Sequence, residues 1–140
     1  IYPEASHNRK RTIRPLSKGF TRIVFGALEK YPDLKITIIP VGLTYQNASF
    51  YPSKVSVNYG NPIAVDTFYN INELNLSIHN LKEEVSNQLK KLSVHITDDE
   101  NYNAILSKLN SLNVDFTNID LVNKMIKENN FTTKNRRKPN

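Results

Sequence analysis

Cysteine is absent from the 140 residues, which excludes disulfide bonds, thiolate metal sites and any covalent mechanism through a thiol. Long apolar runs are absent too. No stretch of about 18 apolar residues could form a membrane-spanning helix, and no basic start leads into the apolar stretch of a signal peptide. The length suits one compact domain with an appendage. Because the sequence starts at Ile1 rather than Met, we expect a fragment of a longer polypeptide.

Positive charge is concentrated near the N-terminus. The formal net charge is +6, and residues 1–35 hold eight Lys or Arg against three acids. Between His7 and Arg22 there is no acid, and the positive residues are Arg9, Lys10, Arg11, Arg14, Lys18 and Arg22. This distribution predicts an anionic partner: a phosphate ester, an anionic lipid surface or nucleic acid.

Apolar spacing predicts a helix and then strands in the first half of the chain. The helical stripe consists of Phe20, Ile23, Val24, Ala27 and Leu28. We expect Ser17 to be its N-cap and Pro32 its stop. The β-branched run 36–43 predicts a strand buried on both faces, with Pro40 at an edge, an end or a bulge. Residues 55–59 alternate as a half-buried strand does, and a turn at 60–62 leads to Ile63.

The second half of the chain predicts helices. Apolar residues spaced by threes and fours over 71–92 predict one long amphipathic helix. Thr97 with Glu100 forms a capping box for another, and Thr117 with Asp120 marks the start of a last one. We therefore expect an α/β fold, a mixed sheet flanked by helices, over residues 1–95. A helical extension then covers 96–131, and the basic segment 132–140 is a disordered tail or linker.

The first residues carry the most specific pattern, Ile1-Tyr2-Pro3-Glu4-Ala5-Ser6-His7-Asn8, followed by the basic loop and Arg14-Pro15-Leu16-Ser17-Lys18-Gly19. This pattern resembles the third sequence block of the glycerolipid acyltransferases, which form phosphatidic acid. Residues 36–41 resemble the fourth block, a β-branched strand ending in Pro-Val, and 55–63 resemble the later strand ending in Gly-x-Pro-Ile. Three ordered matches cover residues 1–92, and the resemblance implies the C-terminal half of an acyltransferase domain.

Two positions depart from the family pattern. Ala5 stands where the family usually has Gly, and alanine destabilises a turn that needs a positive φ. His7 and Asn8 replace a common Arg-Ser pair, although a Ser-His version of the block also occurs. The basic function then passes to Arg9, Lys10, Arg11 or Arg14.

The resemblance implies acyl transfer from an acyl thioester, on coenzyme A or acyl carrier protein, to a hydroxyl of glycerol 3-phosphate or its monoacyl derivative, lysophosphatidic acid. In the family a His-x-x-x-x-Asp block supplies the general base. The three histidines, His7, His79 and His95, have Thr12, Glu84 and Glu100 at the fifth place. No catalytic residue is therefore assigned in this chain, and we expect the pair upstream of Ile1. We interpret His79 and His95 as surface or boundary residues.

The role that the resemblance leaves to this chain is to bind the acceptor's phosphate. Arginine donates bidentate hydrogen bonds to phosphate, and a helix N-terminus adds backbone donors. The substrate-binding candidates are Glu4, Ser6, His7, Arg9, Arg11, Arg14, Lys18 and Gly19. The alternative is that the basic loop is a solvated charged surface.

The expected partners follow from the same activity. They are an acyl thioester donor, glycerol 3-phosphate or its monoacyl derivative, and a membrane surface, with the protein at the cytoplasmic face and without a metal or other cofactor. The alternative function is a non-catalytic basic module that docks on anionic membrane or nucleic acid. Nucleic acid is disfavoured, because the basic run 9–14 contains no aromatic residue for base stacking.

Overall fold

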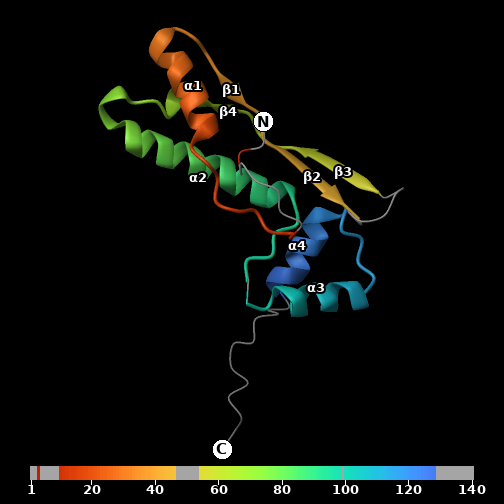
Figure 1. Cartoon of the computed structure of the whole chain (residues 1–140). Coiled ribbons are helices and arrows are strands. Elements are labelled where there is room, and N and C mark those ends of the chain that lie inside the picture. The colour runs from red at the N-terminus through yellow and green to blue at the C-terminus, as the bar shows by residue number, and fades with distance from the viewer. Residues whose placement is uncertain (1–2, 4–9, 47–53, 99, 129–140) are drawn as a thin grey trace, which may run out of the picture.

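The computed structural model describes residue 3 and residues 10–46, 54–98 and 100–128. In the first part helix α1 is followed by four short strands and the long helix α2, and two further helices follow (Figure 1). In chain order the elements are α1 (Gly19–Lys30), β1 (Thr37–Ile38), β2 (Val41–Tyr45), β3 (Val55–Tyr59), β4 (Ile63–Ala64), 3-10 turns at Val65–Thr67 and Ile71–Glu73, α2 (Leu74–Leu92), α3 (Tyr102–Ser111) and α4 (Ile119–Glu128).

Helix α1 forms where the apolar spacing predicts it, but two details differ. Its N-cap is Lys18 rather than Ser17. Ile23, expected in the buried stripe, is 62% exposed, whereas Phe25 is buried. The reason is that Phe25 packs against Tyr69, with 5.3 Å between the ring centroids, which rotates the buried face of the helix. The last turn closes with a hydrogen bond from the Tyr31 N–H to the Ala27 carbonyl, directly before Pro32.

The described strands form two antiparallel pairs. β1 pairs with β4, and β2 pairs with β3. The expected single strand over 36–43 is wrong: the structure breaks it into β1 and β2 at Ile39 and Pro40, because proline has no N–H for a sheet ladder. The Pro40 carbonyl instead accepts from the Gly60 N–H at 2.8 Å. The α/β character is present, and the mixed sheet of an acyltransferase domain stays a prediction.

Burial on both faces was also expected for the run 36–43, and the structure corrects this for β2. Along β2 the residues alternate between exposed and buried, so that Gly42 and Thr44 point inward while Val41, Leu43 and Tyr45 point outward. Gly42 lies so close to the end of α2 that a Cβ there would be 2.2 Å from the Leu92 carbonyl oxygen. Position 42 therefore requires glycine, because the backbone of β2 lies too close to the backbone of α2 to leave room for a Cβ.

Two apolar cores hold the described residues together. The first joins α1, α2 and β4 through Leu16, Phe20, Phe25, Leu28, Ile63, Val65, Leu81, Val85 and Leu89. The second joins α3, α4 and the segments before each of them through Val94, Ile96, Tyr102, Ile105, Leu109, Phe116, Ile119 and Val122. The division at residues 95 and 96 stays a prediction, and the tail 132–140 lies outside the described residues.

The helices of the second half form as predicted in type, but their starts differ. α2 begins at Leu74 rather than Ile71, because the Asn70 side chain accepts from the Asn72 N–H and holds a 3-10 turn there. The expected capping box of Thr97 and Glu100 is wrong, since Asp98 accepts from the Asn101 N–H at 3.1 Å. The Asn101 side-chain amide also donates to this carboxylate, and together these hydrogen bonds lower the pKa of Asp98.

Candidate functional site

The start of α1 is the part of the candidate site that the structure describes best. The Ser17 N–H donates to the Pro3 carbonyl at 2.7 Å, so Pro3, from the pattern at residues 1–8, lies at the N-terminal end of this helix. Lys18 and Gly19 are both exposed there. The other block residues in the candidate set, Glu4, Ser6, His7 and Arg9, lie outside the described residues.

The first turn of α1 has features that suit an anion. It contains no acidic residue, and the side chain of the N-cap Lys18 makes no capping hydrogen bond. Ser17 Oγ accepts from the Gly19 N–H only at a long 3.4 Å. The partial positive charge of a helix N-terminus, with a lysine beside it, can bind a phosphate group. Lys18 and Gly19, which are adjacent in sequence, are both exposed at this helix end, and Arg14 lies half-buried four residues before Lys18. Their role in phosphate binding stays a prediction.

Arg11 has a different environment. Its guanidinium donates to the Tyr45 carbonyl at 3.0 Å and to the Gln46 carbonyl at 3.1 Å. The same group lies over the Phe116 ring. Burial lowers the pKa of Arg11, and Tyr102 opposes that shift. These contacts give Arg11 a structural role that the sequence did not indicate, and its role in phosphate binding stays a prediction.

The basic segment before α1 is bound to the segment before α3. Ile96 N–H donates to the Arg11 carbonyl at 2.8 Å, and Thr12 Oγ1 donates to the Ile96 carbonyl at 2.8 Å. The Arg11 N–H donates to the Tyr102 hydroxyl oxygen at 2.6 Å. In Figure 1 this red segment runs from α1 toward α3 and α4. The second core therefore helps to fix the segment that leads into the α1 N-terminus.

His95 is part of this connection. Its Nδ1 accepts from the Ile13 N–H at 2.8 Å, which places the ring proton of the neutral form on Nε2. Burial lowers the pKa of His95, and the nearby Lys90 lowers it further. Its half-buried position agrees with the expected boundary role. His79, by contrast, is exposed on α2.

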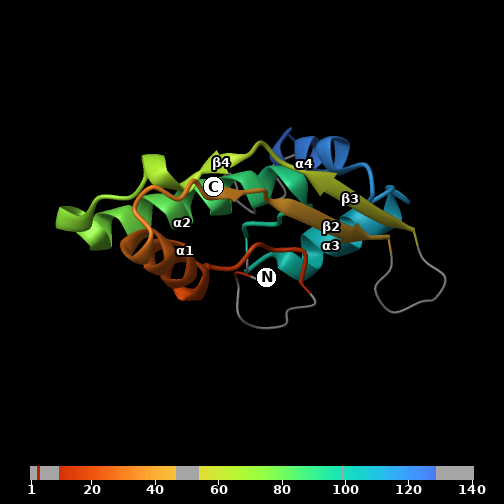
Figure 2. The same ribbon diagram turned by 90° about the horizontal axis from the view of Figure 1, so that it is seen from above.

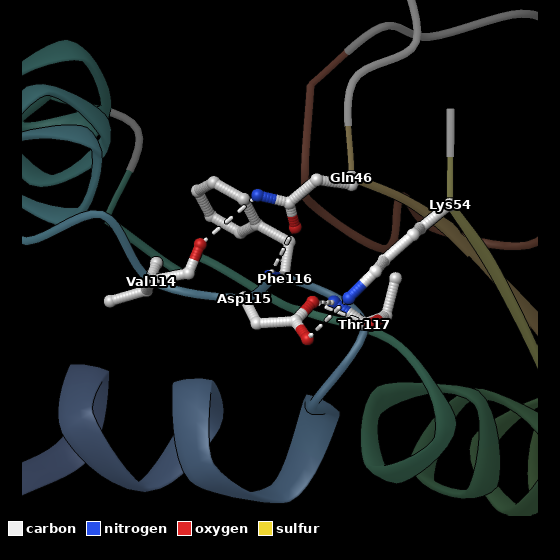
Figure 3. Close-up of polar contacts among 6 residues, drawn as sticks. All are labelled: Gln46, Lys54, Val114, Asp115, Phe116 and Thr117. Atoms are coloured by element: carbon white, nitrogen blue, oxygen red, sulfur yellow. Dashed lines mark hydrogen bonds and ion pairs between the residues drawn. The ribbon is translucent and has the colours of Figure 1, made fainter. Parts of the chain in front are cut away.

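A polar junction joins the β2–β3 hairpin to the loop before α4 (Figure 3). Gln46 Nε2 donates to the Val114 carbonyl at 3.1 Å, and Gln46 Oε1 accepts from the Phe116 N–H at 2.6 Å. Asp115 Oδ2 lies 3.6 Å from Lys54 Nζ. Hydrogen bonds from Thr117, helped by Lys54, lower the pKa of Asp115. Sequence reasoning missed Gln46, since a lone glutamine after a strand gives no local signal of such a contact.

Comparison with known proteins gives three related sequences. Over 105 residues the chain is 25% identical to glycerol-3-phosphate O-acyltransferase 1 of Saccharomyces cerevisiae, a match that covers 71% of this chain and 14% of that protein. Over 93 residues it is 29% identical to glycerol-3-phosphate O-acyltransferase 2 of the same yeast, covering 66% of this chain and 12% of that protein. An uncharacterized acyltransferase of Schizosaccharomyces pombe is 23% identical over 69 residues, covering 49% and 10%.

In sequence the chain is similar, at modest identity, to glycerol-3-phosphate O-acyltransferases. No protein-family model matches it, and no solved structure does. The chain spans about one seventh and about one eighth of the length of the two yeast relatives.

Two further findings concern metals and membranes. Among the residues that the structure describes, no group of three or more His, Asp or Glu side chains is arranged to hold a metal ion. No described helix has both the length and the apolar composition needed to cross a bilayer. The expectations of a reaction without a cofactor and of a membrane surface as partner stay predictions.

Proposed function

We propose that the chain is part of an acyltransferase that transfers a fatty acyl group from acyl-CoA or acyl carrier protein to glycerol 3-phosphate or lysophosphatidic acid in phospholipid synthesis. The segment that leads into α1 binds the phosphate of the acceptor. The catalytic His and Asp come from polypeptide outside the 140 residues, since no histidine here has Asp at the fifth place. The complete enzyme works at the cytoplasmic face of a membrane.

The hydrogen bond from Ser17 to Pro3 is the observation that carries this proposal. This hydrogen bond supports a site in which the pattern at residues 1–8 and the N-terminus of α1 bind the same ligand. Lys18 supplies a full positive charge at the helix end, where the first turn contains no acid. A dianionic phosphate would gain both the charge of the lysine and the backbone donors of the helix.

The contacts of the basic segment favour this proposal over a diffuse docking surface. Arg11 is directed inward to two carbonyls and the Phe116 ring. Lys10 Nζ lies 5.3 Å from the centre of the Tyr102 ring. Lys10 and Arg11 therefore both contact the protein itself, which weakens the case for a patch that binds anionic surfaces through charge density alone.

The test is acyl transfer by the complete gene product with Lys18→Gln. Hydrogen bonds to charged groups contribute about 1.5–3 kcal/mol, so we expect KM for glycerol 3-phosphate to rise about tenfold to hundredfold. Transfer to glycerol, which has no phosphate, should change less than about twofold, because the lost interaction contributes nothing to that acceptor. Lys108→Gln, on the exposed face of α3, is the matched control and should leave both acceptors unaffected.

Three results would contradict the proposal. One is an equal loss with both acceptors, because phosphate binding would then not be involved. Another is a complete gene without a His-x-x-x-x-Asp block. The third is binding of anionic lipid or nucleic acid that weakens steeply with salt while glycerol 3-phosphate gives no saturable protection, which is the behaviour of a basic docking module.

A further inference from the structure

The outward side of the β2–β3 hairpin is apolar. The register places three pairs opposite one another on this side, Val41 with Tyr59, Leu43 with Val57, and Tyr45 with Val55. All six side chains are exposed, by 40% for Val41 up to 71% for Tyr59. We call these six residues the outer face of the hairpin. Monomeric proteins rarely expose contiguous apolar patches larger than a few hundred Å², and larger ones mark interaction sites.

The inward side of the same hairpin is small and polar. Gly42 faces Asn58 in the register, and Thr44 faces Ser56. Gly42 packs against the backbone of Leu92, and Thr44 Oγ1 is buried without a hydrogen-bond partner among the described residues. A sheet with one solvated face normally buries its apolar side and exposes its polar side. The hairpin has the opposite arrangement, which leaves its apolar side in contact with water unless a further layer covers the outer face.

Nothing in the described part of the chain covers this face. Figure 2 shows β2 and β3 lying across α3 and α4, with no described element in front of them. The other exposed large apolar residues lie on helices, in turns and in loops, for example Ile23 on α1, Leu34 after α1 and Leu121 on α4. β2 and β3 also pair only with each other in the described ladder. The hairpin therefore has an exposed apolar face, and the outer edge of each of its strands has no partner in the described ladder.

We propose that the outer face of the hairpin docks the remainder of an acyltransferase domain, a polypeptide layer that brings apolar side chains against the sheet. This inference rests on the proposed function. The two yeast relatives match this chain over 14% and 12% of their length, so proteins of this kind have the additional polypeptide that such a layer needs.

Polypeptide fits the face better than a lipid surface does. Membrane-binding faces combine apolar residues with lysine and arginine that meet anionic head groups. The outer face contains no basic residue, and Lys54 beside it pairs with Asp115 at 3.6 Å. Four of the six side chains are Val or Leu and two are Tyr, all of which pack well between a sheet and a second layer.

Thiol labelling of the complete gene product tests the docking. Val57→Cys places one thiol in the outer face, and Leu121→Cys places a matched one at an exposed position of α4, with 46% and 51% exposure of the native residues. The 140 residues contain no cysteine, so mass spectrometry of the peptides assigns each label. We expect N-ethylmaleimide to react about a hundredfold more slowly at 57 in the native protein than in urea, because a covered thiol reacts only on opening. At 121 the two rates should agree within about tenfold.

The other outcomes overturn the proposal. They are equal native rates at 57 and 121, protection that disappears on dilution and so indicates a second copy, protection that needs anionic vesicles, and a complete gene that encodes only these 140 residues. Leu43→Cys replaces Val57→Cys if that variant does not fold. Labelling does not depend on activity. Protection at 57 together with unchanged kinetics of Lys18→Gln would therefore contradict the phosphate site and leave the docking intact.

Discussion

The guanidinium carbon of Arg11 lies 3.8 Å from the centre of the Phe116 ring. Arg11 precedes α1, and Phe116 belongs to the loop before α4, so this contact joins the basic segment to the second core. Phe116 is itself buried, with 3% exposure. The planar guanidinium stacks on the ring face while its N–H groups reach the Tyr45 and Gln46 carbonyls, a combination that lysine cannot reproduce.

Arg11→Lys should therefore lower the free energy of unfolding by about 1–2 kcal/mol, since it removes the stacked plane and at least one carbonyl contact while keeping the charge. Urea unfolding of the 140-residue chain measures this change. Arg22→Lys, at an exposed position of α1, should change stability by less than about 0.5 kcal/mol. Equal unfolding midpoints for the two variants would show that the stacked contact contributes nothing.

The Gln46 amide makes a second prediction possible. It donates to one carbonyl and accepts from one N–H of the same loop, so Gln46→Glu keeps the acceptor for Phe116 but turns a carboxylate toward the Val114 carbonyl. We expect a loss of about 1–3 kcal/mol at neutral pH. The loss should shrink as pH falls and the carboxyl regains a proton to donate. Asn103→Asp, at an exposed site in the first turn of α3, makes the same charge change and should cost nothing.

A Gln46→Glu variant as stable as the native chain at neutral pH would mean that the Val114 carbonyl finds another donor. A loss of the same size at acidic and at neutral pH would mean that the ionised carboxylate is not its cause. Thermal unfolding between acidic and neutral pH, followed by circular dichroism, separates these outcomes.

The sequence predicted the elements better than the contacts between them. Helix periodicity located α1, α2, α3 and α4, because each helix must bury one stripe. It misplaced Ile23, since the buried face of α1 depends on Tyr69, which is distant in sequence. The capping box at Thr97 failed for a local reason: the Asp98 carboxylate accepts from the Asn101 N–H, and α3 begins only at Tyr102.

The candidate site was predictable only in part. The proximity of Pro3 to the start of α1 agrees with the order of the sequence blocks. The inward turn of Arg11 was not predictable, because it depends on carbonyls 34 and 35 residues away and on a ring in the second core. A basic residue in a loop looks the same in sequence whether it binds a ligand or its own protein.

His95 predicts a dependence of stability on pH. Its pKa is lowered by burial and by Lys90, so the unfolded chain, with a histidine pKa of about 6.5, binds the proton more readily. The contribution is complete above about pH 6.5 and is lost as pH falls from there toward the folded pKa. His95→Asn keeps an acceptor for the Ile13 N–H but does not titrate, so it should flatten the decline of stability over this window.

His79→Asn is the control for this effect, since His79 is exposed on α2. Urea midpoints measured from pH 7 down to pH 5 should fall in parallel for the native chain and His79→Asn, and less for His95→Asn. An unchanged slope in His95→Asn would assign the acid sensitivity to other groups.

Two glycine substitutions should act in opposite directions. At Gly42 an added Cβ would lie 2.2 Å from the Leu92 carbonyl oxygen and 2.7 Å from its carbonyl carbon, both backbone atoms that cannot move without shifting α2. Gly42→Ala should therefore cost about 1–3 kcal/mol or more, as overpacking does. At Gly26, inside α1, an added Cβ meets nothing within 4 Å. Gly26→Ala should stabilise the chain by about 0.5–1 kcal/mol, because alanine favours the helix. Urea unfolding measures the stability of both variants. If Gly42→Ala is as stable as Gly26→Ala, β2 does not approach the end of α2 as closely as described. The inward packing of the hairpin would then have to be revised.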